Sequence, residues 1–420
     1  MIRLLHLADV HLDTAFSGRT DRLRKRLRSA LRSAFERAVD TALAKPVDLV
    51  LIAGDLFDND RLSFATEIFL VEQCERLHEA GIPVVYATGN HDPGGDSFRA
   101  SHIDWPESFR YVDTPEPQTV DVRKEDGSLA ARVITAGHAT AREDRNLAAR
   151  FPHRTESGTD ADVPHIGMLH AHVTRAAQVD RHDRYAPCSV DDLRSATYDY
   201  WALGHIHQRQ QVDADSHAWY AGNIQGRSPR ETGPKGALLV EVEAGDVPHV
   251  TPVDLSPVQW ETITLSDLEQ TATVRTLVGH ARDALDAALR SGSDASVALR
   301  DVIVRVELRG ACPLADTLQD EASMQDLEAA VQDQLGVLDA EIRLRDLTAP
   351  VDVETYRGET HLAGEVLDLL DRAAENDDVL LDIAPDVWAS FGPDASKDDV
   401  RALLNSLDRE AIARLIRSDD

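Results

Sequence analysis

The 420-residue sequence contains few cysteines, few lysines and no long apolar run. Its three cysteines, Cys74, Cys188 and Cys312, are odd in number and far apart, so neither a disulfide framework nor a cysteine zinc site is indicated. No stretch of eighteen or more apolar residues occurs, and the chain starts with a strand-like segment instead of a charged leader and an apolar core. We therefore expect a cytoplasmic protein with no membrane association.

Positive charge is also scarce, because 44 lysines and arginines face 74 aspartates and glutamates, which gives a net charge of −30. A protein that grips nucleic acid normally presents a positive surface, so the composition excludes a broadly basic nucleic-acid-binding protein. The region from Ser256 to Asp420 carries 35 acidic and 15 basic residues, which leaves 39 acidic and 29 basic residues before it. Contacts with an anionic polymer would therefore depend on local positive surface in the less acidic N-terminal part.

The first 93 residues alternate apolar runs with amphipathic stretches, which predicts a β-α-β-α-β order. The expected strands are IRLLHLA, VDLVLIA and IPVVYAT, and the expected helices cover residues 21–43 and 63–80. Each apolar run ends in a polar cluster, respectively DVH, GDLFD and GNHD. Ligand sites in open α/β sheets gather at the carboxyl ends of strands, so these clusters are candidates for one site.

Further strand-like segments follow, and they predict a second sheet packed on the first. They cover residues 165–173, 198–207, 219–223 and 236–244, and Asp126-Gly127 marks the tip of a preceding hairpin. After Leu255 the pattern changes to a small α/β unit, with helices from Val274 and over 323–335 and strands over 301–309 and 338–345. We expect an α/β fold with domains at 1–255, 256–350 and 351–420, the last being helical and acidic.

The first three polar clusters contain residue types that bind metal ions. Asp9 and His11 lie two residues apart at a strand end, so both side chains can point the same way and grip one ion. Asp55 follows a glycine at the second strand tip, where its two oxygens can bridge two cations, although an aspartate capping the next helix is an equally open interpretation. Asn90 offers an amide oxygen beside the imidazole of His91, whereas a simple turn would use the asparagine only for its own backbone.

Two later segments add three imidazoles. His170 ends a buried run, and His205 and His207 close another on the same side of a strand. A lone histidine is usually structural, and a D-x-H tripeptide is commonplace. All five clusters nevertheless occur in order, so independent structural interpretations would have to coincide five times. The sequence therefore predicts a metal site.

The order D-x-H, GD-x-x-D, GNHD, H and GH-x-H resembles the calcineurin-like metallophosphoesterases. The resemblance implies an αββα sandwich, two packed sheets flanked by helices, that holds two divalent ions. It implies that one ion is held by Asp9, His11, Asp55 and His207, and that the second is held by Asp55, Asn90, His170 and His205. The mixture of oxygen and imidazole ligands favours manganese over zinc, iron and magnesium. Such a pair of cations supports in-line displacement at phosphorus.

The same resemblance gives His91 a catalytic role, in which it stabilises the transition state or protonates the leaving oxygen. In this family an aspartate often orients the histidine, and Asp58 or Asp92 could do so here. Some nucleases of the family carry a histidine at the position of Asp58, so this chain departs from that pattern.

Beyond the metal motifs, residues 1–255 resemble the SbcD-type DNA repair nucleases, and in particular their YhaO-like exonuclease branch. The resemblance is carried by HLADVHLDTAF, LIAGDLFDND, YATGNHDP and YAGNIQGRSPRETGPKGALLVEV. It implies DNA as the substrate, a capping domain after Leu255, and C-terminal helices that dock on an SbcC-like or YhaN-like coiled-coil ATPase. The expected docking helix follows Ala395, with packing of its apolar stripe on the protein itself as the alternative. A homodimer is left open.

Arginines on the first predicted helix and in the loop after Asn223 are candidates for DNA phosphate contacts, with a solvated face of paired charges as the alternative. The candidates are Arg24, Arg28, Arg227 and Arg230. The sequence thus predicts a manganese-dependent DNA exonuclease in double-strand break repair. A phosphatase for nucleotides or phosphoproteins would share every metal ligand. The alternative from another class is a non-catalytic DNA-binding subunit, and the intact ligand set argues against it.

Overall fold

The computed structural model describes residues 1–58, 62–95, 99–124, 126–154, 162–174, 185–212, 217–291, 301–350, 352, 355–357 and 361–383. The chain divides into two compact units. The first comprises Met1–Glu261 with Gly292–Ile303, and the second comprises Thr262–Ser291 with Val304–Asp420. The helix expected after residue 395 lies outside the described residues. The domain limits at 255 and 350 stay predictions.

The first unit contains a six-stranded sheet in which β1 to β4 run parallel. In spatial order its strands are β14 (His249–Asp254), β13 (Gly236–Val242), β1 (Ile2–Leu7), β2 (Leu49–Ala53), β3 (Val84–Ala87) and β4 (Phe109–Val112). β13 is antiparallel to β1, and β14 is antiparallel to β13. Helices α1 (Asp21–Ala44) and α2 (Phe64–Glu79) connect β1 to β2 and β2 to β3, which confirms the predicted β-α-β-α-β order.

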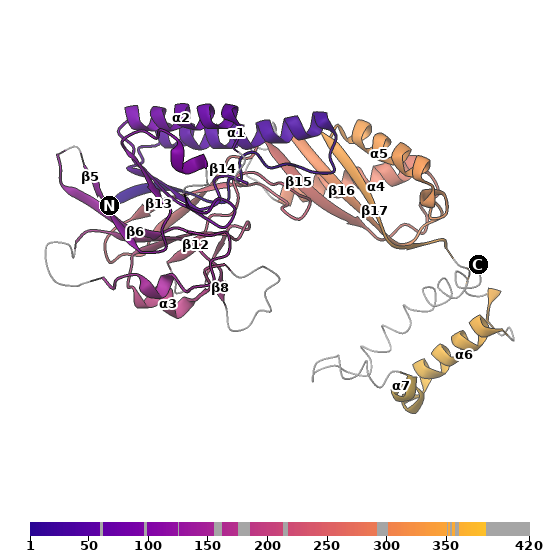
Figure 1. Cartoon of the computed structure of the whole chain (residues 1–420). Coiled ribbons are helices and arrows are strands. Elements are labelled where there is room, and N and C mark those ends of the chain that lie inside the picture. Colours follow the sequence, from indigo (N-terminus) through magenta and orange to yellow (C-terminus); the bar gives the residue numbers. More distant parts are fainter. Residues whose placement is uncertain are drawn as a thin grey trace. The chain divides into compact units, whose positions relative to one another are not determined.

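Both helices begin at a capping residue and bury one apolar face. Thr20 caps α1 by accepting a hydrogen bond from the backbone N–H of Leu23, and Ser63 caps α2 in the same way through Thr66. The buried side chains of α1 recur every three or four residues, as an amphipathic helix requires. They are Leu23, Leu27, Ala30, Leu31, Ala34, Phe35, Ala38, Val39 and Ala42. α1 and α2 lie side by side along the same face of the sheet (Figure 1).

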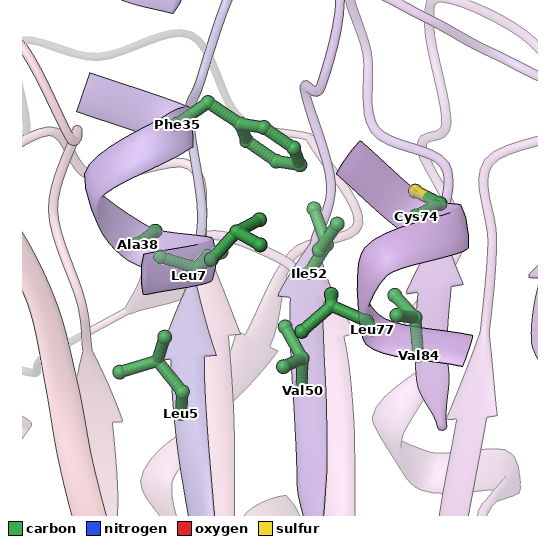
Figure 2. Close-up of a pocket in the computed structure, with 10 residues that line it drawn as sticks. Leu5, Leu7, Phe35, Ala38, Val50, Ile52, Cys74, Leu77 and Val84 are labelled. Atoms are coloured by element: carbon green, nitrogen blue, oxygen red, sulfur yellow. The ribbon is translucent and has the colours of Figure 1, made fainter. Parts of the chain in front are cut away.

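A small apolar cavity lies where these helices meet β1, β2 and β3 (Figure 2). Phe35 of α1 and Cys74 and Leu77 of α2 point toward Ile52 and Val84 of the sheet. The cavity has a volume of about 10 Å³ and an apolar lining. A space of this size holds at most one water molecule, and an apolar lining gives that water no hydrogen-bond partners. The cavity is therefore a packing irregularity of the core.

The second sheet of the first unit also has six strands. In spatial order they are β11 (Gln210–Gln211), β12 (Ala218–Tyr220), β10 (Tyr200–Gly204), β7 (His165–His170), β6 (Leu129–Ala136) and β5 (Gln118–Arg123). β12, β10, β7 and β6 run parallel, and β5 and β6 form the antiparallel hairpin expected around Gly127. The prediction that residues 236–244 belong to this sheet is wrong, because β13 pairs with β1 in the first sheet. An apolar strand pattern indicates burial and does not identify the neighbouring strand.

The main core lies between the two sheets and confirms that they pack together. Leu4 and Leu51 from the first sheet join Val133, Met168 and Ala202 from the second in one buried cluster. A further cluster covers the outer face of the second sheet, where helix α3 (Val190–Ser195) follows the short paired strands β8 (Val173–Thr174) and β9 (Cys188–Ser189). Helices thus flank a pair of sheets, as predicted for an αββα sandwich.

The second unit contains most of a three-stranded sheet with two helices. Its strands are β15 (Val258–Leu265), β16 (Asp301–Ala311) and β17 (Asp339–Thr348), with β16 in the centre. Helices α4 (Val274–Ser291) and α5 (Glu321–Leu335) match the predicted small α/β pattern, and α6 (Leu362–Glu375) and α7 (Asp377–Ile383) follow. Every helix among the described residues is too short or too polar to span a membrane.

Candidate metal centre

The predicted ligands emerge where neighbouring strands end. The backbone N–H of Asp9 donates to the carbonyl of Gly54 (3.2 Å), and that of His11 donates to the carbonyl of Asp55 (2.9 Å), so the first two motifs run side by side. Asp9, His11 and Asp55 have φ angles of 49°, 51° and 53°, and His205 has a φ of 101°. A non-glycine residue pays about 1–2 kcal/mol for the left-handed conformation. Such strain concentrates at functional sites.

Two glycines of the motifs permit a close approach of the ligands. A Cβ atom at Gly54 would lie 2.2 Å from Nδ1 of His170, and a Cβ atom at Gly89 would lie 2.2 Å from Oδ1 of Asp55. Gly54 also has a φ of 83°, which side-chain-bearing residues rarely adopt. Glycine at these two positions therefore lets Asp55 and His170 converge.

Four predicted ligands form a first group around His11. Nε2 of His11 lies 3.3 Å from Nε2 of His207 and 3.5 Å from Oδ2 of Asp55. Nε2 of His207 lies 3.8 Å from Oδ1 of Asp9. Asp9, His11 and His207 each offer a ligand atom within 4.8 Å of the others. These are the four residues expected to share one ion.

The remaining predicted ligands form a second group around His170. Nε2 of His170 lies 2.9 Å from Oδ1 of Asn90 and 3.4 Å from Oδ2 of Asp55. The ring of His205 meets that of His170 edge to face, with 5.4 Å between the ring centroids. The backbone N–H of His205 donates to the carboxylate of Asp9 at 3.1 Å. Because Oδ2 of Asp55 is close to both groups, this carboxylate occupies the position of a bridging ligand.

The chemistry of this donor set fits two divalent cations. Nδ1 of His170 donates to the carbonyl of Ala53 at 3.0 Å, so Nε2 is the nitrogen that would bind a cation in place of a proton. Burial lowers the pKa of His11 to about 3, so this imidazole is neutral at physiological pH. Burial opposes ionisation of Asp55, but the charge of the His170 and His91 imidazoles and a hydrogen bond from the backbone N–H of His91 hold its pKa well below its usual range. A neutral imidazole and an ionised carboxylate are the forms that bind cations.

His91 lies beside the first group and is held by Asp58. Nδ1 of His91 is 3.0 Å from Oδ1 of Asp58, and this contact raises the pKa of His91. The same oxygen of Asp58 lies 3.3 Å from Nδ1 of His11 and 3.3 Å from Nη1 of Arg227. The side chain of His91 is 39% exposed, so it can meet a substrate from solvent. Asp58 thus links the candidate catalytic histidine to a candidate ligand.

Asp92, the other predicted partner of His91, faces the interior of the protein. Its Oδ1 accepts hydrogen bonds from the backbone N–H groups of Gly89 (2.7 Å) and Asp55 (3.2 Å). Its Oδ2 accepts from the backbone N–H of Phe57 (3.1 Å) and from the hydroxyl of Tyr86 (2.5 Å). The described contacts therefore give Asp92 the task of holding the backbone under the site, and they place Asp58 against His91.

The four arginines predicted to contact DNA have different environments. Nε of Arg28 donates to a backbone carbonyl in the loop after the D-x-H motif at 3.0 Å, and so fastens that loop. Arg227 lies within the site and is only 15% exposed. Arg24 contacts Asp21 on the exposed face of α1, and Arg230 is exposed. Arg28 and Arg230 are exposed and Arg24 is partly exposed, so three of the four candidates can present guanidinium groups to solvent.

Two residues near the ligands were not identified from the sequence. Oε1 of Glu231 accepts a hydrogen bond from Nδ1 of His207 at 2.7 Å. Burial alone would raise the pKa of Glu231, but the hydrogen bond from His207 and the charge of Arg227 lower it to about 2. Nε2 of the buried His138 donates to the carbonyl of His170 at 2.7 Å. Glu231 lies in the segment that carries the nuclease resemblance, but no sequence pattern around it distinguishes it from the many other acidic residues.

The chain is similar to several known proteins. The family model for calcineurin-like phosphoesterases matches residues 2–209. The chain is 33% identical over 337 residues to the uncharacterized metallophosphoesterase YhaO of Bacillus subtilis (strain 168), with 79% of this chain and 78% of that protein covered. It is 32% identical over 274 residues to the DNA double-strand break repair protein Mre11 of Aeropyrum pernix, with 60% of this chain and 61% of that protein covered. Among solved structures, a dimetal phosphatase from Danio rerio matches with a TM-score of 0.35 and 12% identity, over 61% of this chain and 99% of that chain.

Proposed function

Because this chain belongs to the calcineurin-like phosphoesterase family, we propose that it is a manganese-dependent phosphodiesterase that degrades DNA as an exonuclease in double-strand break repair. The observation that carries the proposal is the convergence of ligand atoms from five separate motifs, with Asp55 shared between two groups and His91 beside them. The similarity to Mre11, a protein named for double-strand break repair, supports DNA as the substrate.

The proposed chemistry divides between the cations and the side chains of this chain. Two bound divalent cations supply Lewis acidity, which lowers the pKa of water and offsets negative charge on the phosphate. One cation would be held by Asp9, His11, Asp55 and His207, and the other would be held by Asp55, Asn90, His170 and His205. His91, with Nδ1 held by Asp58, turns Nε2 toward the substrate and gives a proton to the leaving oxygen.

The substrate is tested by offering the purified protein several phosphate esters with manganese. We expect linear DNA to be shortened from its ends, while circular DNA and p-nitrophenyl phosphate stay intact. Rapid hydrolysis of the monoester or of nucleotides, with DNA unchanged, would favour a phosphatase instead. DNA binding without any hydrolysis would favour a non-catalytic subunit.

The variant His91→Ala separates catalysis from metal binding. We expect it to bind two manganese ions per chain, measured by calorimetry, and to lose turnover by a factor of about 10² to 10⁴, which is the usual contribution of a general acid. Unchanged turnover would remove His91 from the mechanism.

DNA contact by exposed arginines accounts for binding despite the negative charge of the chain. The accessible candidates are Arg24 and Arg28 on α1 and Arg230 in the loop after β12. Because Arg28 also donates to the backbone of the loop after the D-x-H motif, Arg24 and Arg230 are the two chosen for the test. Replacing each with Gln should weaken DNA binding for all sequences and reduce the slope of log affinity against log salt by about 1 per contact. Arg123→Gln on β5 serves as the control, because Arg123 is exposed and pairs with Asp121 away from the metal ligands. An unchanged salt slope in the two test variants would refute these contacts.

A coiled-coil ATPase of the SbcC-like or YhaN-like type is the proposed partner, and the residues after Ala395 are its proposed docking segment. Leu362 of α6 is 63% exposed and adds apolar surface to this C-terminal region. Co-expression followed by affinity purification should recover the ATPase with the full chain and lose it when the residues after Ala395 are deleted. Full retention by the truncated chain would contradict this docking segment.

A further inference from the structure

Glu231 lies in a loop outside the five metal motifs, yet it contacts a predicted ligand directly. Its Oε1 accepts a hydrogen bond from Nδ1 of His207 at 2.7 Å. Its Oε2 accepts from Nδ2 of Asn223 at 2.9 Å and from the backbone N–H of Arg227 at 2.6 Å. The carboxylate is only 14% exposed. Both oxygens of this mostly buried carboxylate therefore bond to the loop or to His207.

The loop that carries Glu231 is itself fastened to β15. Nε2 of Gln225 donates to the carbonyl of Val258 at 2.7 Å, and Oε1 of Gln225 accepts from the backbone N–H of Val258 at 3.1 Å. Nε1 of Trp260 donates to the carbonyl of Gly226 at 2.8 Å. Gln225 and Trp260 are almost fully buried, at 0% and 1% exposure. The carboxylate of Glu231 is thus presented by a rigid segment.

The Glu231 contact fixes which nitrogen of His207 is free. Nη2 of Arg227 also lies 3.4 Å from Nδ1 of His207, and a guanidinium can only donate. The carboxylate contact is the shorter by 0.7 Å, and an ionised carboxylate can only accept. Nδ1 therefore carries the proton and donates to Glu231. Nε2 keeps its lone pair and faces Asp9 and His11, at 3.8 Å and 3.3 Å.

A carboxylate that accepts a hydrogen bond from a ligand histidine strengthens metal binding more than a carbonyl does. Its charge makes the imidazole more basic as well as orienting it. The second group offers the comparison, since His170 donates its Nδ1 hydrogen to the carbonyl of Ala53. The two groups of ligands therefore differ in the hydrogen-bond acceptors of their histidines. His207 donates to an anionic carboxylate, and His170 donates to a neutral peptide oxygen.

We propose that Glu231 is a positioning residue that acts through His207 and strengthens cation binding in the group of Asp9, His11, Asp55 and His207, but not in the group around His170. This inference rests on the two-cation site of the proposed function and is independent of the proposed DNA substrate. Loss of such an outer carboxylate typically weakens metal binding by a factor of about 10 to 100. Glu231→Gln should therefore weaken the binding of one manganese ion and leave the binding of the other unchanged.

The test is a manganese titration of the chelator-stripped full chain, followed by isothermal calorimetry. In Glu231→Gln we expect one of the two binding events to weaken by a factor of about 10 to 100 and the other to keep the affinity of the original protein. In Glu231→Asp we expect part of that loss to be recovered, because the charge is restored at a shorter reach. Phosphodiesterase turnover of Glu231→Gln should recover at high manganese concentration, whereas the manganese concentration for half-maximal turnover rises.

Two controls separate positioning from folding and from the proposed function. Glu241→Gln removes a partly buried carboxylate that pairs with Arg3, so both manganese affinities should stay unchanged. Thermal unfolding in chelator reports whether Glu231→Gln folds as the original protein does. Equal affinities in Glu231→Gln and the original protein, or an equal loss at both sites, would overturn the inference. Absence of two manganese sites in the original protein would instead overturn the proposed function.

Discussion

Replacing Asp92 with Ala should mainly lower the stability of the protein, whereas replacing Asp58 with Ala should mainly lower its turnover. Asp92 is fully buried and accepts hydrogen bonds from three backbone N–H groups and from the hydroxyl of Tyr86. Ala offers none of them an acceptor, and a buried donor left without a partner costs about 1–3 kcal/mol. The three backbone groups alone give a loss of about 3–6 kcal/mol if water replaces part of what is removed. That loss is a large share of the stability of a typical domain.

Asp58 is bound differently, because its described contacts are with the side chains of His11, His91 and Arg227. Among its described contacts the carboxylate of Asp58 accepts from side chains and from no backbone N–H group, so removing it should cost less stability than removing Asp92. Without the carboxylate, however, the ring of His91 loses the group that holds Nδ1. We expect turnover of a phosphodiester to fall by a factor of about 10² to 10⁴ in Asp58→Ala.

Urea unfolding and steady-state turnover, measured on both variants at the same manganese concentration, decide the matter. Asp92→Ala should unfold at clearly lower urea concentration than the original protein, and Asp58→Ala should unfold at a concentration between the two. The reasoning is refuted if Asp58→Ala keeps its turnover, or if Asp92→Ala unfolds where the original protein does. The reverse pattern would assign the orientation of His91 to Asp92.

Three further outcomes are expected. Gly89→Ala places a Cβ atom 2.2 Å from Oδ1 of Asp55, so manganese affinity in calorimetry should fall at least tenfold; Gly279→Ala on α4 has open space around it and should keep that affinity. Burial lowers the pKa of His6 from 6.5 to about 3. Below pH 6.5 the unfolded chain therefore takes up a proton at His6 while the folded chain does not. The contribution of His6 to stability is thus present above pH 6.5 and declines as the pH falls. Between pH 7 and pH 5 this loss is about 2 kcal/mol, and His6→Asn, compared by urea unfolding at the two pH values, should lack it. Removal of divalent cations with a chelator should lower the midpoint of thermal unfolding, because manganese at a hundredfold excess over its dissociation constant contributes about 2.7 kcal/mol, and an unchanged midpoint would speak against a cation site in the folded chain.

The sequence by itself determined the order of the elements and the set of candidate ligands. Apolar runs that end in polar clusters predict strands with chemistry at their carboxyl ends, and parallel strands bring those ends to one edge. Asp9, Asp55, Asn90 and His170 could be selected for this reason without knowledge of any distance. The β-α-β-α-β start and the small α/β pattern after residue 255 followed from periodicity in the same way.

Only the tertiary structure decided which side chains support that set. Arg227 and Asp58 are 169 residues apart in sequence, and they meet because the loop after β12 closes over the ends of β1 and β2. Local patterns specify the type and burial of an element but not its neighbours, so β13 was expected in the wrong sheet and Glu231 was overlooked. The choice of Asp58 over Asp92 depended likewise on which carboxylate the folded backbone turns toward His91 and which it encloses.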